Sequence, residues 1–191
     1  MKHKTPGEFI IFGALQFAFL MFIAEFLYPG YSVSKNYISD LGVGPEPSRA
    51  IFTISIIIFG ASLLIATYLL WKGGNDKVFP VLLALAGIGS IGVGLFNEID
   101  HTPLHILSAL LAFGSGGIAA ISSSRLSKPP FSYVSIFLGL MTLIALVLLR
   151  THNYLDLGVG GMERMVAYPI IFWAIGFSAY LMHPTEQESA I

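Results

Sequence analysis

The chain has 191 residues, of which 55% are hydrophobic and 11% charged, and its mean hydropathy is +0.77. This composition is too apolar for a water-soluble domain of that length, so it predicts an integral membrane protein. A net charge of −1 without a basic run argues against a nucleic-acid partner, and the absence of cysteine excludes disulfides, thiolate metal sites and a thiol nucleophile.

Six apolar stretches are expected to cross the bilayer as helices, since one span needs about 20 apolar residues. They cover approximately residues 9–27, 50–71, 78–96, 103–121, 131–149 and 162–182. The first stretch is too long for the apolar region of a signal peptide and no small-residue cleavage site follows it, so we expect it to be retained. With no internal repeat and no linker, residues 1–191 are predicted to form one all-α domain, a six-helix transmembrane bundle.

The longest polar connection, residues 28–49, joins the first two spans and contains Asn36, Ser39, Asp40 and Glu46. It is too long for a simple reversal, and connections of this length are typical of lids and binding loops. We therefore expect it to fold back over the end of the bundle, with residues 36–41 as a short helical turn.

Spans three and four each carry small residues at regular spacing. The predicted faces are Ala86, Ser90 and Gly94, with Gly87, Gly89 and Gly92, on span three, and Ala109, Ala112, Gly116 and Ala120 on span four. Small residues let two transmembrane helices approach closely. These two spans are thus expected to form a tightly packed hairpin.

The tip of that hairpin is a polar knot at residues 97–105, in which five of the nine positions are Asn, Glu, Asp or His. Thr102 followed by Pro103 predicts a helix N-cap and first helical residue. His105 would then lie near the positive end of the helix dipole, which favours a neutral imidazole. His101 lies before the cap, so we do not expect it to share a face with His105.

The basic residues favour one orientation in the membrane. Six lie on the side of the termini and four on the other side: Lys2, Lys4, Lys72, Lys77, Arg125 and Lys128 against Lys35, Arg49, Arg150 and Arg164. This bias places both termini in the cytoplasm and the protein in the cell membrane as a multi-pass protein. Most acids and three histidines then gather at the extracytoplasmic end: Glu25, Asp40, Glu46, Glu98, Asp100, Asp156, Glu163, His101, His105 and His152.

The stretch Tyr37-Ile38-Ser39-Asp40-Leu41-Gly42, with Asn36 before it and Pro45 and Arg49 after it, resembles the signature of a known family. That family is the prokaryotic membrane family catalogued as domain of unknown function 998. Further agreement comes from Asn97-Glu98 with His105, and from Glu163-Arg164 leading into Tyr168 and Trp173. The resemblance covers nearly the whole chain. It implies a six-span architecture and no assigned reaction.

A more distant similarity is to the eukaryotic DRAM, Frag and Sfk group. That group shares a Tyr-Ile-Ser-Asp-x-Gly stretch after its first span and a histidine that opens a later span. Its proline pair after the glycine corresponds here to Pro45-Glu46-Pro47. The similarity implies a role in lipid handling, and it carries over to Ser39, Asp40 and His105.

The candidate catalytic residues are Glu98, His105 and Asp40, which could act as acid–base groups at the mouth of the bundle. For His105 the alternative is a histidine that only bonds a loop carbonyl and holds the hairpin tip. For Asp40 the alternatives are a cap for the loop helix or a salt bridge to Arg49 or Arg164. Ser39 is a weaker candidate for a nucleophile.

The candidate binding residues are Ser39, Asn36, Glu163 and Arg164, although the last two favour an architectural role at the start of span six. His105, His152 and Asp156 could complete a three-ligand metal set, and a zinc ion with one open position would suit hydrolysis. Sequence spacing alone does not establish such a site, because no short-range pair such as His-Glu-x-x-His is present.

Three functions therefore compete. The first is a membrane protein that binds or modifies lipid in an extracytoplasmic polar pocket, as a hydrolase or transferase if it is an enzyme. The second is a non-catalytic sensor or scaffold, in which Arg49, Arg150 and Arg164 close the acids into salt bridges without a cavity. A transporter of ions or small solutes is the third, disfavoured because no charged residue lies near the middle of a span. The expected partner is membrane lipid.

Overall fold

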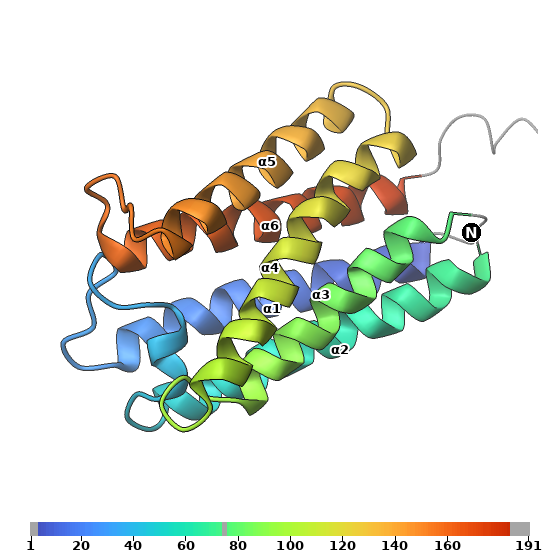
Figure 1. Ribbon diagram of the computed structural model, residues 1–191. Coiled ribbons are helices and arrows are strands. Elements are labelled where there is room, and N and C mark those ends of the chain that lie inside the picture. The colour runs from blue at the N-terminus through green and yellow to red at the C-terminus, as the bar shows by residue number, and fades with distance from the viewer. Residues whose placement is uncertain (1–3, 74–75, 184–191) are drawn as a thin grey trace, which may run out of the picture.

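The computed structural model describes residues 4–73 and 76–183 (Figure 1). Six long helices account for most of these residues: α1 (Lys4–Leu27), α2 (Ser48–Gly73), α3 (Val78–Leu95), α4 (Thr102–Ser123), α5 (Phe131–Arg150) and α6 (Gly158–Met182). Two short 3-10 helices, η1 (Ser39–Gly42) and η2 (Ser124–Leu126), lie in the connections. All six α-helices are long and apolar enough to cross a membrane. The predicted class, an all-α protein with six membrane-spanning helices, is confirmed.

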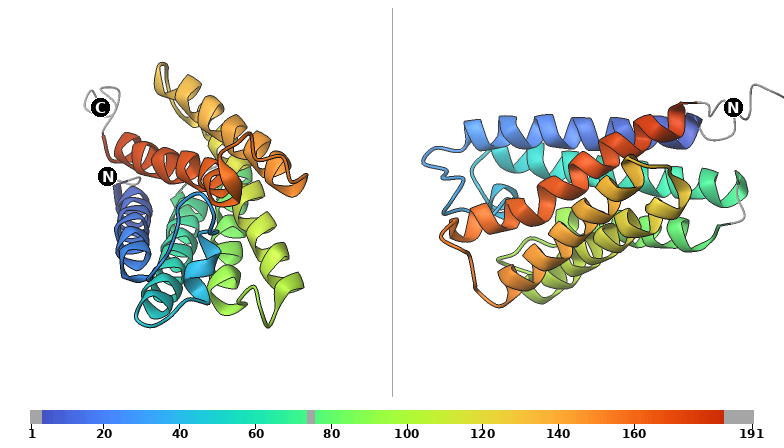
Figure 2. Two further views of the ribbon diagram at one scale, coloured as in Figure 1. Left: turned by 90° about the vertical axis from the view of Figure 1, so that its left-hand side faces the viewer. Right: turned by 90° about the horizontal axis from the view of Figure 1, so that it is seen from above.

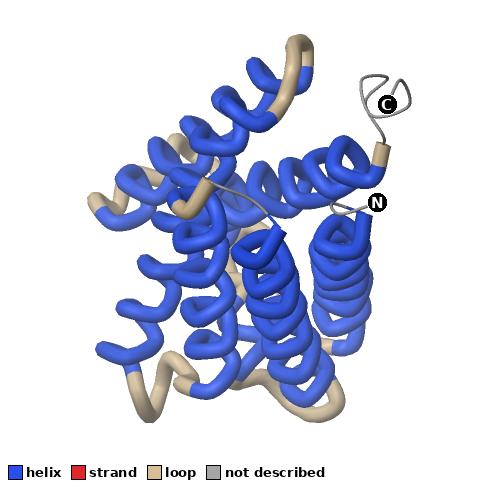
Figure 3. Tube along the Cα trace, turned by 90° about the vertical axis from the view of Figure 1, so that its right-hand side faces the viewer, coloured by secondary structure: helices blue, strands red, loops and turns tan. Residues whose placement is uncertain are grey.

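The helices form a closed ring in chain order. Each helix packs on the next one along the chain, α6 completes the ring against α1, and α4 also contacts α6 (Figure 2). The start of α1 and the end of α6 lie together, since a Cβ added at Gly7 would be 2.9 Å from the Met182 side chain (Figure 3). The opposite end, where α1, α3 and α5 end, is called the loop end below. Which end faces the cytoplasm stays a prediction, and Lys2 lies outside the described residues.

Small residues bring α3 close to both of its neighbours, which differs from the predicted single face. A Cβ at Gly89 would lie 2.4 Å from the Ala112 nitrogen of α4, whereas a Cβ at Gly94 would lie 2.7 Å from the Ile57 side chain of α2. On α4, Gly116 faces Ile170 of α6 rather than α3. The expected hairpin of α3 and α4 is present, and it uses Gly89 and Ala112 of the predicted faces, whereas Gly94 and Gly116 face other helices.

Helix α6 begins four residues before the expected Met162, so Glu163 and Arg164 lie in its second turn and not in its first. The glycines that predicted a loop here are helical because they touch the α1–α2 connection. A Cβ at Gly160 would lie 2.0 Å from the Asn36 carbonyl oxygen, and the Gly160 N–H donates to the Ser34 carbonyl at 3.0 Å. Glycine therefore lets the connection lie directly on the helix.

The α4 start also differs by one position from the prediction. His101 is the N-cap, Thr102 is the first helical residue, and the proline follows it. The Thr102 hydroxyl donates to the Glu98 carbonyl at 2.7 Å instead of capping the helix, while the Asn97 side chain accepts the N–H groups of Ile99 and Asp100 at 3.0 and 2.7 Å. The knot is thus a compact turn held by its own side chains, with His101 exposed.

Candidate functional site

The α1–α2 connection lies over the middle of the loop end, between α2 and α6 (Figure 2). Its short helix η1 buries Ser39 and Leu41, and Leu41 is fully inaccessible to solvent. Apolar burial of Ile38 and Leu41 supplies the driving force that keeps this segment on the bundle. The polar residues of the connection are thereby brought to α6 and to the start of α4.

Arg164 is the main anchor of this connection. Its Nη1 donates to the carbonyls of Val33 and Gly160 at 2.9 Å and of Asn36 at 3.3 Å. Its Nη2 donates to the Glu25 carboxylate and to the Tyr31 hydroxyl, the latter at 2.8 Å. Arg164 is 4% exposed, and only its Nε lacks a partner among the described residues. One guanidinium therefore joins α1, the connection and α6.

Tyr31 extends this cluster outward from the arginine. Its hydroxyl accepts from Arg164 and donates to the Tyr37 carbonyl at 2.8 Å. Burial raises the pKa of the Tyr31 hydroxyl, because a phenolate would be poorly solvated there. The phenol thus stays a neutral donor at all physiological pH values.

Glu163, next to Arg164 on α6, holds the other side of the connection. It is 7% exposed, and its carboxyl accepts the Ile38 N–H. The Ile38 N–H lies at the start of η1, so the carboxyl supplies the partner that the short helix lacks at that end. Glu163 and Arg164 have separate partners, and no ion pair joins them to each other among the described residues.

Asp40 uses one carboxylate oxygen to hold the α1–α2 connection together. Its Oδ2 accepts the Asn36 amide at 2.8 Å and the Tyr37 N–H at 3.0 Å, and the Asn36 side-chain oxygen accepts the Ser32 N–H at 3.1 Å. The predicted salt bridges from Asp40 to Arg49 or Arg164 are wrong. Arg49 pairs with Glu46 at 2.7 Å, and Arg164 pairs with Glu25.

Glu98, in the turn between α3 and α4, is an acid whose pKa is strongly raised. It accepts the Ser39 hydroxyl at 2.7 Å. Burial raises the pKa of Glu98 to about 8, and a hydrogen bond with the Asp40 carboxyl raises it further, partly offset by the Ser39 hydroxyl. Two carboxyls and one hydroxyl thus share a proton network at the tip of the α3–α4 hairpin.

His105 lies beside this network on the first turn of α4 and is 8% exposed. Its Nδ1 is 2.8 Å from the Phe96 carbonyl oxygen. A carbonyl can only accept, so Nδ1 carries the proton and Nε2 is the unprotonated nitrogen. Nε2 has no partner among the described residues. The hydrogen bond holds the hairpin tip, as one alternative expected, and also leaves a free acceptor.

The three residues expected to bind a metal are not brought together. His105 is turned to the Phe96 carbonyl, while Nδ1 of the exposed His152 is 2.9 Å from the Tyr154 hydroxyl. Asp156 is exposed on a turn with a positive φ of 60°. Within residues 4–73 and 76–183, no three side chains of His, Cys, Asp or Glu form a group that could hold a metal ion.

A cavity of about 340 Å³ opens at the loop end between the connection, α4 and α5. It is lined by most of the predicted polar residues, including Ser39, Asp40, Glu98, His105, His152 and Glu163, and by Arg150. Asn36 and Arg164, predicted as binding residues, do not line it, because they hold the connection from the other side. The second alternative, in which arginines close every acid into a salt bridge, does not describe this region.

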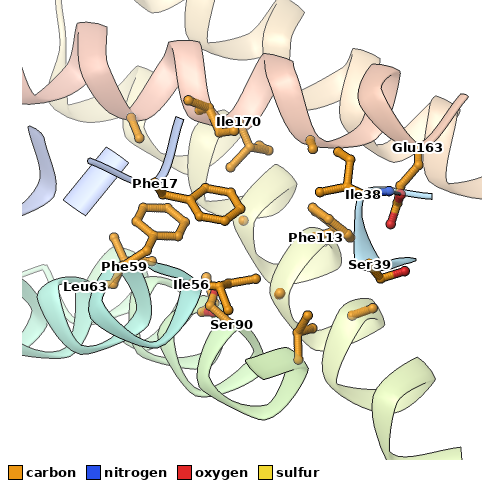
Figure 4. Close-up of a pocket in the computed structure, with 18 of the residues that line it drawn as sticks. Phe17, Ile38, Ser39, Ile56, Phe59, Leu63, Ser90, Phe113, Glu163 and Ile170 are labelled. Carbon is orange, nitrogen blue, oxygen red and sulfur yellow. Dashed lines mark hydrogen bonds between the residues drawn. The ribbon is translucent and has the colours of Figure 1, made fainter. Parts of the chain in front are cut away.

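A second, narrower cavity of about 60 Å³ continues into the bundle (Figure 4). Its walls are almost entirely apolar, from Ile38 and Ile56 to Phe59 and Trp173. Along α6 it extends from Glu163 to Ala174, which corresponds to roughly 16 Å at the helical rise of 1.5 Å per residue. Both cavities are lined by Ser39, Ala109, Phe113, His105 and Glu163, so they adjoin at the polar network.

The sequence did not point to several partners in this region. Glu25 was placed among the acids of the extracytoplasmic end, but nothing near it in the chain indicates Arg164, which is 139 residues away. Tyr31 and Tyr37 carried no signal, because an aromatic residue near a membrane surface is usually an interfacial anchor. The apolar cavity was not predicted either, since it arises from side chains of five α-helices and of the α1–α2 connection.

The six apolar helices define a polytopic helical membrane protein. The chain belongs to the family described as "Protein of unknown function (DUF998)", whose model matches residues 11–180. No curated protein and no solved structure matches it. The similarity to the DRAM, Frag and Sfk group stays a prediction.

Proposed function

We propose that this protein binds an amphipathic membrane lipid, with the polar headgroup in the larger cavity and part of an acyl chain in the narrow one. One observation carries the proposal: a polar cavity and an apolar cavity adjoin at Ser39, His105 and Glu163. A soluble polar ligand would gain nothing from the apolar walls, and a hydrocarbon would make no use of the carboxyls and the imidazole that line the larger cavity. A lipid has both parts in the right order.

The position of the polar cavity agrees with a headgroup site. It lies at the loop end, where the basic-residue bias places the extracytoplasmic surface of the cell membrane. A headgroup at that level stays near water while its chain remains within the hydrocarbon region. The proposal therefore includes a lipid of the outer leaflet as the occupant.

Filling the junction of the two cavities tests lipid binding. Ala109 lines both cavities on α4, so Ala109→Trp should displace the lipid. Leu107→Trp is the matched control, because Leu107 is on the same helix and is 62% exposed. Native mass spectrometry of the detergent-extracted proteins should show a bound lipid in the wild type and in Leu107→Trp, and its loss in Ala109→Trp. Equal lipid occupancy in all three would contradict the proposal, as would a wild type without lipid.

Catalysis on that lipid, by an intramembrane hydrolase or transferase, is a second candidate function. It is favoured by the Ser39 hydroxyl, the Glu98 carboxyl and the free His105 Nε2, which line one cavity. Such groups could move a proton to or from a reacting oxygen. Glu98→Gln and His105→Ala, assayed separately, should then abolish lipid turnover while the proteins remain folded. Folded variants with wild-type lipid profiles would count against catalysis.

A further inference from the structure

The larger cavity is lined by more acidic than basic side chains, and this difference restricts the charge of the ligand it can bind. Arg150, the exposed last residue of α5, is the single Lys or Arg among its lining residues. Arg164 does not line the cavity, and its donors are engaged by Glu25, Tyr31 and three backbone carbonyls. The inner part of the cavity therefore lacks a cation that could receive an anionic group.

Among the polar side chains that line the cavity, hydrogen-bond acceptors outnumber cations. Asp40, Glu98 and Glu163 contribute carboxyls, and His105 contributes Nε2, an unprotonated nitrogen on a ring that is more than nine-tenths buried. Nε2 is not one of the buried polar atoms that lack a partner, so it is accessible from the cavity and a donor from a ligand can reach it. A group with several N–H donors and a positive charge satisfies all of these acceptors together.

The aromatic lining argues against a quaternary ammonium. Recognition of a trimethylammonium group uses the faces of several aromatic rings. Apart from the two histidines, Tyr37 and Phe113 are the aromatic residues that line this cavity, and Phe113 also lines the apolar one. The cavity offers hydrogen-bond acceptors rather than a cage, so a primary ammonium is the better fit.

We infer that the lipid has a primary-amine headgroup of the phosphatidylethanolamine type, with its ammonium among Asp40, Glu98 and His105 and its phosphate toward Arg150. This assignment rests on the proposed lipid binding and narrows it to one class of headgroup. An ammonium beside Asp40 and Glu98 would favour the ionised forms of both carboxyls and so make them charge-assisted acceptors. Arg150 supplies the opposite charge that a zwitterionic headgroup needs.

Trp173 provides a reporter for this inference. It lines the apolar cavity and is 2% exposed, so lipids around the outside of the bundle do not reach it. Trp71 is the other tryptophan and is 46% exposed, so Trp71→Phe leaves Trp173 as the single fluorophore. Lipids with brominated acyl chains quench a tryptophan on contact, and quenching therefore reports a chain inside the bundle.

The experiment titrates detergent-solubilised Trp71→Phe protein with brominated phosphatidylethanolamine and, separately, with brominated phosphatidylcholine of the same chains. Half-maximal quenching should need roughly tenfold less of the ethanolamine lipid, a difference of about 1.4 kcal/mol. Adding Glu98→Gln, which keeps an acceptor for Ser39, should abolish the preference. Adding Glu46→Gln should preserve it, because Glu46 is an acid of the same connection that pairs with Arg49 outside the cavity.

The outcomes distinguish the primary-amine headgroup from lipid binding itself. Equal quenching by both lipids, or a preference that survives Glu98→Gln, would overturn the primary-amine assignment and leave lipid binding in place. No quenching by either lipid would overturn the proposed function itself. A thermal midpoint raised as much by soluble phosphoethanolamine as by the lipid would show a free amine as the ligand, and would overturn the lipid source.

Discussion

Two polar clusters lie side by side at the loop end and differ in how completely their groups are paired. In the Arg164 cluster, the cation is matched by Glu25, Tyr31 and the carbonyls of the connection, and Arg164 lines neither cavity. In the Glu98 cluster, burial and the nearby Asp40 carboxyl raise the pKa of Glu98, and the His105 Nε2 has no partner within the described chain. Both clusters include residues of the connection, but Arg164 lies on α6, whereas Glu98 and His105 lie at the tip of the α3–α4 hairpin.

This contrast separates a structural role from a binding role. A paired cluster mainly stabilises the fold, because every donor of Arg164 except Nε already has a partner. Acceptors that line a cavity stay accessible to a ligand. The adjacent residues Glu163 and Arg164 differ in the same way. The Glu163 carboxyl lines both cavities, and the Arg164 guanidinium lines neither.

Removing the cation of the Arg164 cluster should have the largest effect. Arg164→Met leaves Glu25 without its partner and releases three carbonyls, so we expect the free energy of unfolding to fall by about 3–5 kcal/mol. Unfolding in mixed micelles measures this loss, and proteolysis within residues 28–47 should become faster. Arg164→Met with Glu25→Gln should recover part of the stability. Full stability of the single variant would contradict the paired Arg164 cluster.

The contact between the connection and α6 should be the next most sensitive feature. A Cβ at Gly160 would meet the carbonyl oxygens of Asn36 and Val33 at 2.0 and 2.5 Å, so Gly160→Ala should destabilise the protein by about 1–3 kcal/mol. Gly114→Ala is the control, because no atom lies within 4 Å of the added carbon, and alanine is the better helix former by about 1 kcal/mol. The thermal midpoints should move in opposite directions. Equal shifts would mean that the connection does not rest on α6.

Sequence reasoning was most successful where one physical effect dominates. Runs of about 20 apolar residues predict the six helices, because a helix is the form that satisfies its own backbone in lipid. The ends of helices were less accurate. Gly158 and Gly160 predict a loop by composition, yet they are helical because the connection packs on them, and this contact joins residues more than 120 positions apart.

The sequence predicted where the candidate site lies but not which of its side chains contact one another. The excess of acids and histidines at residues 97–105 pointed to the hairpin tip, and Glu98, His105 and Asp40 do line one cavity. The hydrogen bond between Ser39 and Glu98 depends on how a long loop folds over the bundle, and no spacing encodes it. The grouping of His105, His152 and Asp156 failed for the same reason, since each histidine has a local partner for Nδ1.

The last expected effect is the pH dependence that the Glu98 cluster adds to stability. In the folded protein the pKa of Glu98 is raised to about 8, against an ordinary value of 4.5, chiefly by burial. The folded state therefore binds the proton more tightly than the unfolded state, and the slope of stability against pH is negative between these two values. The stabilisation by the protonated form is fully present below about pH 4.5 and is lost as the pH rises through about 8.

Glu98→Gln removes this titration while keeping the size of the side chain. The wild type should thus lose thermal stability from pH 5 to 8 more steeply than Glu98→Gln, with the two curves furthest apart at the alkaline end. Glu46→Gln is the control, because the pKa of that exposed acid is lowered by Arg49 and its titration lies below this range. Bound phosphatidylethanolamine should flatten the wild-type slope, since its ammonium replaces the proton. Parallel curves for the wild type and Glu98→Gln would mean that Glu98 is already ionised at neutral pH, and that the two clusters do not differ in the way argued above.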